Sequence, residues 1–444
     1  MGPDYRRPEV DTPPAYVQPT EEGESFANTP WWELFRDPEL QSLIRTALED
    51  NKDLGIAVAR IDEFRAVLGV TRADQFPTLD VGATAGRANG SDYVFPGNLV
   101  DGAVDNYRLG ADVFFEVDLF GRLRRSTEAA RAQLLATEEA RRSITISLVA
   151  SVASSYMLLR DLDAQLEIAQ RTEEAREASL AIIRARFDKG TVPRLDLNQA
   201  EIELAVASAA VAAAGRALAQ TENRLGILLG RNPGRISRGL ALQQQVMPPA
   251  IPAGLPSELL QRRPDVLSSE ASLAAQTARI GVAQAARWPS LSLTGALGFE
   301  SGELSDLTRS GSDFWSAGAG LFAPVFNAGR NKSRVEIERA RTEQALLAYQ
   351  QTVLRAFAEV EDALVAVRTY REEHAARRRQ VEAARSAARL SRARYDGGVT
   401  SYLEVLDTER SLFSAELTES QTLRLYIDAI IGLYKALGGG WNPE

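Results

Sequence analysis

The chain has 444 residues, a length that allows two or three domains and a large buried core. It carries 51 basic and 60 acidic residues, so it has no electrostatic footprint for a nucleic-acid partner. It has no cysteine, which excludes disulfides and thiolate metal sites. The single histidine, His374, lies in a charged helical stretch and is expected to be a solvated surface residue. Zinc sites and catalytic triads need partners that the chain lacks.

The first half of the chain has one order of elements. Residues 1–37 are predicted to be extended, and a structural unit follows over 38–230. Its first helix ends at Phe76-Pro77, because the residue before a proline leaves the α region. Alternating apolar and polar residues then predict two strands, and a proline-free stretch predicts a helix about 100 Å long. The expected elements are a helix over 51–75, strands over about 78–87 and 107–118, a long helix over about 122–187 and an alanine-rich helix over about 194–229.

The second half repeats this order. The turn "FDKGTVPRLDLNQAE" begins at Phe187, and "YDGGVTSYLEVLDTE" begins at Tyr395, 208 positions later. A proline-rich linker over 231–255 therefore joins two copies of one unit, and a short tail follows the second copy. The second copy spans 256–438, with strands over about 290–300 and 315–325, a long helix over about 330–395 and a helix over about 402–437, before a tail over 439–444.

The strands have one apolar and one polar face, which leaves two interpretations open. One is a small soluble sheet packed on helices. The other is part of a membrane β-barrel with a wet lumen, since strand length and alternation fit one. No uninterrupted run reaches the roughly 18 apolar residues of a spanning helix, which excludes helical spans. Four strands cannot close a barrel, and lipid does not tolerate an open edge. Two chains would pool eight strands and three would pool twelve; physical reasoning alone does not choose.

The chain resembles the TolC/OprM-like outer-membrane efflux proteins over nearly its whole length. The resemblance is carried by the two glycine turns, by the "GR" helix starts at Gly121 and Gly329, and by the opening "GPDYRRP". It implies a mainly α protein with membrane β: a homotrimer whose twelve-stranded barrel continues into a twelve-helix periplasmic tunnel. The opening resembles the lipidated branch of the family, which implies a native lipoprotein anchored at a cysteine that this sequence does not contain.

The implied function is a passive exit duct in the outer membrane of a Gram-negative bacterium. It would carry drugs or other small toxic compounds and would work with a periplasmic adaptor and an inner-membrane RND-type pump. A type I protein secretion channel shares this architecture and is the first alternative; a soluble coiled-coil scaffold is the second. An adaptor protein would need a lipoyl-like β segment, which is not visible. No enzyme motif and no cofactor motif is present, so no catalytic, cofactor or metal residue is expected.

The resemblance also implies three sets of functional residues. The duplicated turns would be helix tips at the periplasmic entrance, where the family carries acidic rings. Glu404 departs from the aspartate that the family usually has, and Ser401 with Glu404 fits a capping box as an alternative role. Arg194 and Arg394 are candidate partners for the acids. The predicted gate comprises Asp196, Glu404, Asp407, Tyr395 and Arg394. The predicted adaptor-docking tips comprise Gly190, Thr191, Val192, Gly397, Gly398 and Val399. The predicted membrane-interface aromatics are Tyr107 and Trp315 at one interface, and Phe76 and Trp288 on the periplasmic side.

Overall fold

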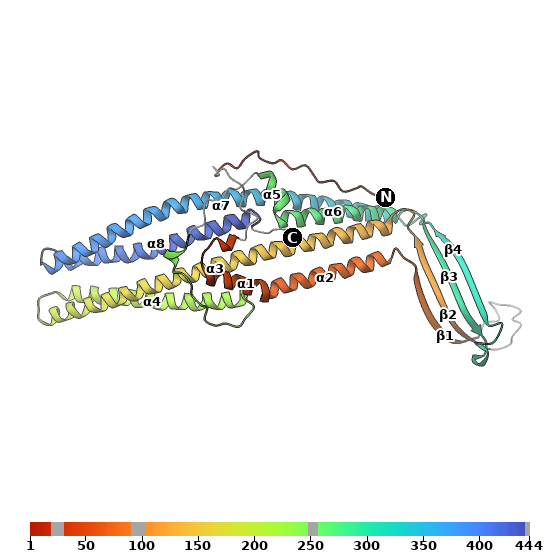
Figure 1. Ribbon diagram of the computed structural model, residues 1–444, viewed down its shortest axis with the longest axis horizontal. Coiled ribbons are helices and arrows are strands. Elements are labelled where there is room, and N and C mark those ends of the chain that lie inside the picture. Colours follow the sequence, from red (N-terminus) through yellow and green to blue (C-terminus); the bar gives the residue numbers. More distant parts are fainter. Residues whose placement is uncertain (19–30, 90–102, 247–255, 440–444) are drawn as a thin grey trace. The chain divides into compact units, whose positions relative to one another are not determined.

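The structure is a computed structural model that describes residues 1–18, 31–89, 103–246 and 256–439 (Figure 1). Long helices and one sheet account for most of these residues. The elements are η2 (Trp31–Glu33), α1 (Pro38–Asp50), α2 (Lys52–Ala73), β1 (Thr78–Ala88), β2 (Val104–Val117), α3 (Arg122–Asp188), α4 (Arg194–Leu228), η3 (Leu242–Gln244), α5 (Pro256–Arg262), α6 (Pro264–Ala285), β3 (Ser290–Ser301), η4 (Leu304–Asp306), β4 (Asp313–Phe322), α7 (Arg330–Asp396) and α8 (Tyr402–Ala436).

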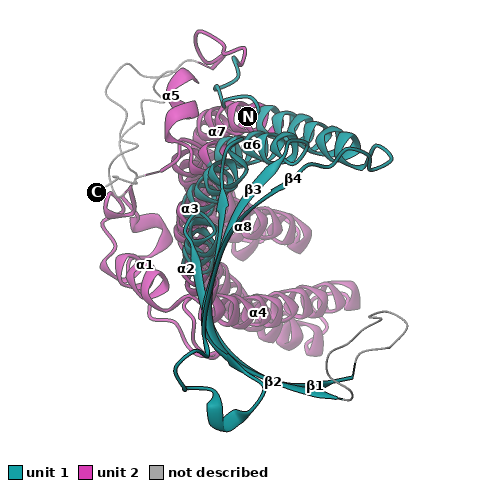
Figure 2. Cartoon of the chain, turned by 90° about the vertical axis from the view of Figure 1, so that its right-hand side faces the viewer, with its two compact units in different colours: residues 1–9, 60–138, 268–350 teal, residues 10–59, 139–267, 351–444 magenta. Residues whose placement is uncertain are grey.

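The chain forms two compact units, and each unit takes segments from both sequence repeats (Figure 2). One copy of the repeat is therefore not an independent folding domain, because its strands and its helix ends belong to different units. Unit 1 comprises residues 1–9, 60–138 and 268–350, and unit 2 comprises residues 10–59, 139–267 and 351–444.

Unit 1 contains a four-stranded antiparallel sheet in the order β1-β2-β3-β4. The pairing of β2 with β3 joins the two sequence repeats, with Ala111 opposite Leu297. The last strand was predicted over about 315–325, but β4 starts at Asp313 and ends at Phe322. It stops before Pro324 because proline has no N–H to donate to a neighbouring strand.

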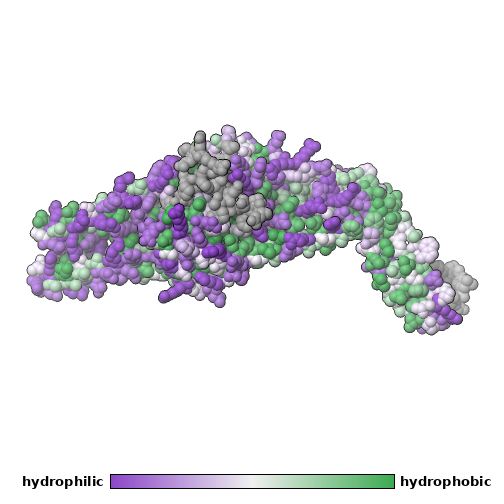
Figure 3. Space-filling model, viewed as in Figure 1, coloured by the Kyte–Doolittle hydropathy of each residue, from purple (hydrophilic) through white to green (hydrophobic). Residues whose placement is uncertain are grey.

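The register gives the sheet two chemically different faces. On the apolar face, Val81, Ala111, Leu297 and Trp315 form one row across all four strands. All of β1 is exposed, and so are Trp315 and Leu321 at 80% and 69% of their surfaces. The other face is mostly small and polar, but Phe114, Phe314 and Phe322 also lie on it, which the strand pattern did not predict. Apolar residues run along the strands in the space-filling view (Figure 3).

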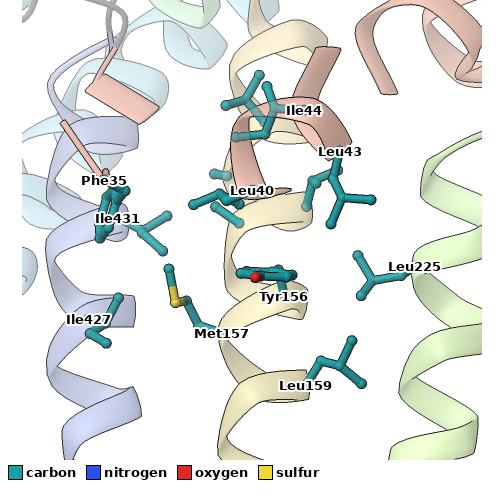
Figure 4. Close-up of a cluster of buried hydrophobic side chains, with 14 of the residues drawn as sticks. Phe35, Leu40, Leu43, Ile44, Tyr156, Met157, Leu159, Leu225, Ile427 and Ile431 are labelled. Carbon is teal, nitrogen blue, oxygen red and sulfur yellow. The ribbon is translucent and has the colours of Figure 1, made fainter. Parts of the chain in front are cut away.

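Unit 2 has its largest core where α1 packs against α3, α4 and α8 (Figure 4). Tyr156 and Met157 of α3 are fully buried there, together with Leu40 of α1. Asp37 caps α1 and is also fully buried. Its carboxylate accepts hydrogen bonds from the Tyr156 hydroxyl at 2.9 Å and from Gln245 Nε2 at 2.8 Å. The N-terminal segment is thereby fixed to α3 and to the segment that follows α4.

Two expectations about unit 2 are corrected. The segment 1–37 is not wholly extended, because Trp31–Glu33 forms a 3-10 helix whose Trp31 stacks on Tyr434 with ring centroids 5.4 Å apart. His374 is not a freely solvated residue: its side chain is 18% exposed and lies 2.9 Å from Glu419. The reason is that α7 and α8 pack side by side, so the histidine faces the neighbouring helix. The predicted tail falls mostly outside the described residues.

A third correction concerns membrane spans. The helices α3 and α4 each contain an 18-residue stretch apolar enough to cross a membrane by length and composition. Neither stretch is an uninterrupted apolar run, because serine and other polar residues are interspersed. In α3, 56% of that stretch is buried within the chain, as in the core helix of a soluble protein, whereas in α4 only 11% is buried. The described part of the chain therefore leaves the small apolar side chains of α4 uncovered.

Candidate functional site at the helical hairpin tips

The helix pairs α3–α4 and α7–α8 form two hairpins whose tips lie in unit 2, and both turn by the same backbone device. Gly190 and Gly398 have φ values of 73° and 72°. The Thr191 amide donates to the Arg186 carbonyl, and the Val399 amide donates to the Arg394 carbonyl, each at 2.9 Å. These six-to-one bonds, with glycine in the left-handed region, define a Schellman cap. The repeated glycine is therefore explained by the backbone that ends each long helix.

The predicted docking residues surround these caps. Gly190, Thr191, Gly397 and Gly398 are exposed, and Val399 presents 71% of its surface. A Cβ atom at Gly190 or Gly398 would meet no atom within 4 Å, so the space beyond both turns is open among the described residues. Val192 differs, because it packs partly buried against the tip core.

That tip core joins the two hairpins. Its members come from all four helices, and Tyr402, Val405 and Leu406 are its most buried residues on α8. Burial raises the pKa of Tyr402 to about 12. The buried cluster comprises Leu180, Ile183, Leu197, Ala200, Tyr402, Val405 and Leu406, with Phe187, Val192, Leu204 and Tyr395 packed on it.

The first predicted gate acid, Glu404, links the end of α7 to the start of α8. Its carboxylate accepts a hydrogen bond from the Thr400 hydroxyl and lies 3.4 Å from the Arg394 guanidinium. The alternative capping box does not form, since Ser401 makes no side-chain capping hydrogen bond. The glutamate is drawn instead to a basic side chain on the preceding helix. Arg394, one of the two predicted partners, is thus in contact with a gate acid.

The other two predicted gate acids have no such contact. Asp196 is half-buried in the first turn of α4, and Asp407 is exposed on α8. Neither has an ion pair with any described residue, and Arg194 does not act as a bridge. Partial burial raises the pKa of Asp196 above its ordinary value, since desolvation disfavours the charged form.

Tyr395 is the aromatic member of the predicted gate, and it faces the other hairpin. The Arg186 guanidinium lies 5.2 Å from the Tyr395 ring centroid, within the range of a cation–π contact. The Tyr402 ring lies 5.5 Å away on the other side. The Tyr395 hydroxyl is buried without a hydrogen-bond partner among the described residues. The side chain therefore holds the two hairpins together by packing.

A buried ion cluster behind the tips was not found from the sequence. Arg176 of α3 and Glu203 of α4 are 4% and 6% exposed, and their charged atoms lie 2.5 Å apart. Arg410 of α8 also contacts Glu203, and Glu409 lies 3.9 Å from Arg176. The only sequence feature that could have indicated this cluster was Glu203, an acid within the alanine-rich helix α4. Its partners lie 27 and 207 positions away, so the sequence did not connect them.

Next to this cluster, unit 2 has a cleft of about 700 Å³ between α3, α7 and α8. It is basic, because five arginines line it against two glutamates. Glu416 contacts Arg171 at 2.6 Å and Arg385 at 2.8 Å. Its charged lining comprises Arg171, Arg176, Arg385, Arg389, Arg392, Glu409 and Glu416. No group of acidic and histidine side chains that could hold a metal is found within the described ranges.

The predicted interface aromatics lie at the two ends of the sheet in unit 1. Phe76 and Trp288 directly precede β1 and β3, at the end where the strands join helices. Trp288 stacks on Phe120 with ring centroids 5.4 Å apart. Tyr107 and Trp315 lie near the opposite ends of β2 and β4, and Tyr107 is half-buried. The register sets Tyr107 opposite Ser301 but Trp315 opposite Leu297, so the two aromatics are staggered along the strands.

The chain matches known proteins over almost its full length. The family model "Outer membrane efflux protein" matches residues 43–231 and 255–439. The solvent efflux pump outer membrane protein SrpC of Pseudomonas putida is 38% identical over 412 residues, covering 92% of this chain and 87% of that protein. The cation efflux system protein CusC of Escherichia coli O157:H7 is 35% identical, covering 100% and 96%. The open-state crystal structure of the MtrE outer membrane channel of Neisseria gonorrhoeae matches with a TM-score of 0.90 at 33% identity, covering 99% and 98%.

Proposed function

This chain belongs to the outer membrane efflux protein family and is an outer-membrane efflux channel of a Gram-negative bacterium; from that premise we propose that three copies form one passive exit duct, gated at the hairpin tips. In this proposal the strands close a twelve-stranded barrel, and the four long helices of each chain contribute to a twelve-helix tunnel. The family likeness supports three copies rather than two.

The observation that carries the proposal is the sheet. One face is apolar along most of its length and is exposed on β1 and half-buried on much of β2, and β1 and β4 have no strand partner on their outer edges among the described residues. Lipid does not tolerate unpaired backbone groups, so an edge must pair with another strand. Pairing β4 of one copy with β1 of the next is a head-to-tail contact, which closes a ring when the rotation fits. The soluble-scaffold alternative leaves this apolar face in water.

The uncovered face of α4 also requires contact with an adjacent copy of the chain. The apolar stretch of α4 that is only 11% buried within one chain would be covered by a helix of the next copy. Alanine side chains allow two helices to approach closely, which suits contacts between copies along a tunnel. Both the open edges of the sheet and the uncovered face of α4 are therefore satisfied by one ring of chains.

The gate proposal rests on where the acids lie. Asp196, Glu404 and Asp407 all lie within the first turns after the tips, and two of them have no ionic partner among the described residues. Three copies would bring these acids into rings around one entrance, where like charges concentrate on a narrow axis. Such rings attract cations. Arg394 would neutralise part of the charge through Glu404.

We assign the exposed tips to a periplasmic adaptor and, through it, to an inner-membrane RND-type pump. The supporting observation is an apolar residue, Val399, that presents 71% of its surface directly after the exposed cap at Gly398. The proposed cargo is small toxic compounds, because relatives are named for solvent and for cation efflux. No observation on this chain favours the alternative of protein secretion.

For the membrane, we propose that Tyr107 and Trp315 mark one interface, and Phe76 and Trp288 the periplasmic one. Their places at opposite ends of the strands support this assignment. Spin labels at each position would measure depth directly. A label at Trp315 that reported the centre of the bilayer would reject it.

A disulfide-crosslinking experiment tests the assembly. The chain has no cysteine, so no native thiol competes with a pair introduced in β1 and β4, and each single-cysteine variant controls for disulfides between like positions. Thr84→Cys is combined in turn with Ser316→Cys, Gly318→Cys or Gly320→Cys to sample the register between copies. The proposal predicts bands of one, two and three chains and no larger species. A series that stops at two chains, or a helical monomer by light scattering in detergent, would reject the trimer.

A further inference from the structure

The polar face of the sheet holds one basic residue, Arg108, in a fixed position. Its guanidinium lies 2.8 Å from the Asp112 carboxylate and 4.9 Å from the centroid of the Phe314 ring. A charged group beside a carboxylate and over an aromatic face is held by both contacts. Arg108 therefore extends along β2 over Gly110 to Asp112, with the Phe314 ring of β4 beside it, instead of extending freely into solvent.

A row of glycines makes room for this arrangement. Gly82, Gly110 and Gly298 are directly opposite one another on β1, β2 and β3, and Phe314 follows on β4. A Cβ atom at Gly110 would lie 3.4 Å from the Phe314 ring and 3.5 Å from Arg108 Nε. At Gly298 it would collide with the Leu109 carbonyl oxygen at 2.2 Å. The phenylalanine ring thus lies against bare backbone, with the arginine above it.

The remaining charges on this face are acidic. Asp80 and Asp112 are directly opposite each other, and Glu116 and Glu300 lie on the same face. Glu116 is already paired with Arg122 at 2.7 Å, and Glu300 accepts a hydrogen bond from Asn106. Arg108 is the only basic residue on the polar face of the four strands, whose residues the structure describes throughout. It is thus the one positive charge that offsets the four acids of this face.

We propose that Arg108, placed by Phe314 and Asp112, forms a ring of three cations inside the barrel that offsets the acids of the polar face and so weakens the preference for cations at this level of the lumen. The proposal rests on the trimeric barrel proposed above, in which the polar face lines the lumen. A twelve-stranded barrel is about 25 Å across between backbones, from its strand spacing of about 4.8 Å and a strand tilt of about 40°. The Debye length of about 10 Å at 0.1 M salt spans much of the radius of such a lumen.

The test measures the local electrostatic potential inside the barrel without depending on the state of the tips. Ser316→Cys places a single thiol on the exposed polar face of β4, two strand spacings or about 10 Å from Asp112. Intact trimers are treated with an anionic reagent, sulfonatoethyl methanethiosulfonate, and a cationic one, trimethylammonioethyl methanethiosulfonate. The readout is the ratio of the two modification rates, anionic over cationic.

Arg108→Ala is expected to lower this ratio about two- to four-fold at 0.01 M ionic strength, and less at 0.15 M, because salt screens the charge. Arg108→Lys keeps the charge and is expected to keep most of the ratio, while Phe314→Leu is expected to fall between the two. The matched control is Arg87→Ala, which removes the same charge from β1 on the opposite face.

The possible results distinguish a failure of the Arg108 ring from a failure of the trimeric barrel. If trimers form and Arg108→Ala leaves the rate ratio unchanged, or changes it no more than Arg87→Ala does, the cation ring is wrong and the duct stands. A thiol that neither reagent reaches in intact trimers overturns the lumenal placement of Arg108. A wild-type chain that forms no trimer overturns both the inference and the proposed duct.

Discussion

The two hairpin tips are copies of one motif, yet they hold their acids differently. Arg186 and Arg394 occupy equivalent positions, 208 residues apart, and so do Asp196 and Glu404. In the second hairpin, Arg394 lies 3.4 Å from Glu404. In the first, the guanidinium of Arg186 lies over the ring of Tyr395 at 5.2 Å, and Asp196 has no ionic partner among the described residues.

Two side-chain differences explain why the two copies of this turn hold their acids differently. Aspartate is one methylene shorter than glutamate, and the position equivalent to Thr400 is Val192, which cannot donate a hydrogen bond. The second hairpin therefore neutralises its acid internally, whereas the first uses its arginine to contact the second hairpin. The backbone caps are alike, but the charged side chains differ: the second tip pairs its acid within the same hairpin, and the first directs its arginine to the second hairpin.

The largest expected effect comes from the buried ion cluster behind the first tip. Glu203→Ala leaves the Arg176 guanidinium buried without its partner, which costs about 3–5 kcal/mol in comparable cases. We expect a clear drop in the thermal unfolding midpoint of the trimer. Glu201→Ala is the matched control, since its side chain is 46% exposed on the same helix. Equal midpoints for the two variants would show that the cluster carries no stability.

The glycine caps should behave alike in both tips. Gly190→Ala and Gly398→Ala each force a left-handed residue to carry a Cβ, which costs about 1–2 kcal/mol, and no described atom is near enough to add a clash. Denaturation of the two variants should give equal losses. Gly397→Ala, one residue before the second cap and without a positive φ, is the control and should lose less. Unequal losses at 190 and 398 would break the equivalence of the caps.

Removal of Arg394 should destabilise one hairpin tip, and removal of Arg186 should destabilise both. Arg394→Ala removes an exposed ion pair worth about 0.2–1 kcal/mol, within the second hairpin only. Arg186→Ala removes a contact of about 0.5–1 kcal/mol that joins the two hairpins. Hydrogen exchange resolved to peptides should therefore show faster exchange in one tip for Arg394→Ala and in both tips for Arg186→Ala. The same pattern for both variants would contradict the division of roles.

The smallest expected effect is the pH dependence of Asp196. Burial raises its pKa in the folded protein, so the folded state favours the protonated acid. Its contribution to stability is present at low pH and is lost as pH rises through the folded pKa. Asp196→Asn should therefore raise the unfolding midpoint slightly at pH 7, and the gain should vanish toward pH 3. Asp407→Asn removes one exposed charge and controls for net charge. If Asp196→Asn still raised the unfolding midpoint at pH 3, desolvation of the charged carboxylate would not be the cause of the increase.

The sequence predicted the parts that local rules determine. The family is confirmed, and the glycines at 190 and 398 could be placed because a helix that ends in a left-handed residue needs them. The strands began after Pro77 and Pro289 as expected. The alternative in which Ser401 and Glu404 form a capping box was wrong, because the Glu404 carboxylate pairs instead with Arg394 of the preceding helix. The partners of Glu203 and the cleft beside it depend on contacts across the fold, which no local pattern reports.

The central claim is that three copies form one channel whose entrance carries the tip acids. A planar-bilayer recording of the wild type and of the Asp196→Ala and Asp407→Ala variants tests it most directly. If the tip acids line the entrance, the wild type forms discrete channels that prefer cations, and both variants form intact trimers with a weaker cation preference. Wild-type channels that conduct ions without a preference for cations would contradict the central claim. An unchanged cation preference in both variants would instead return these acids to surface solvation.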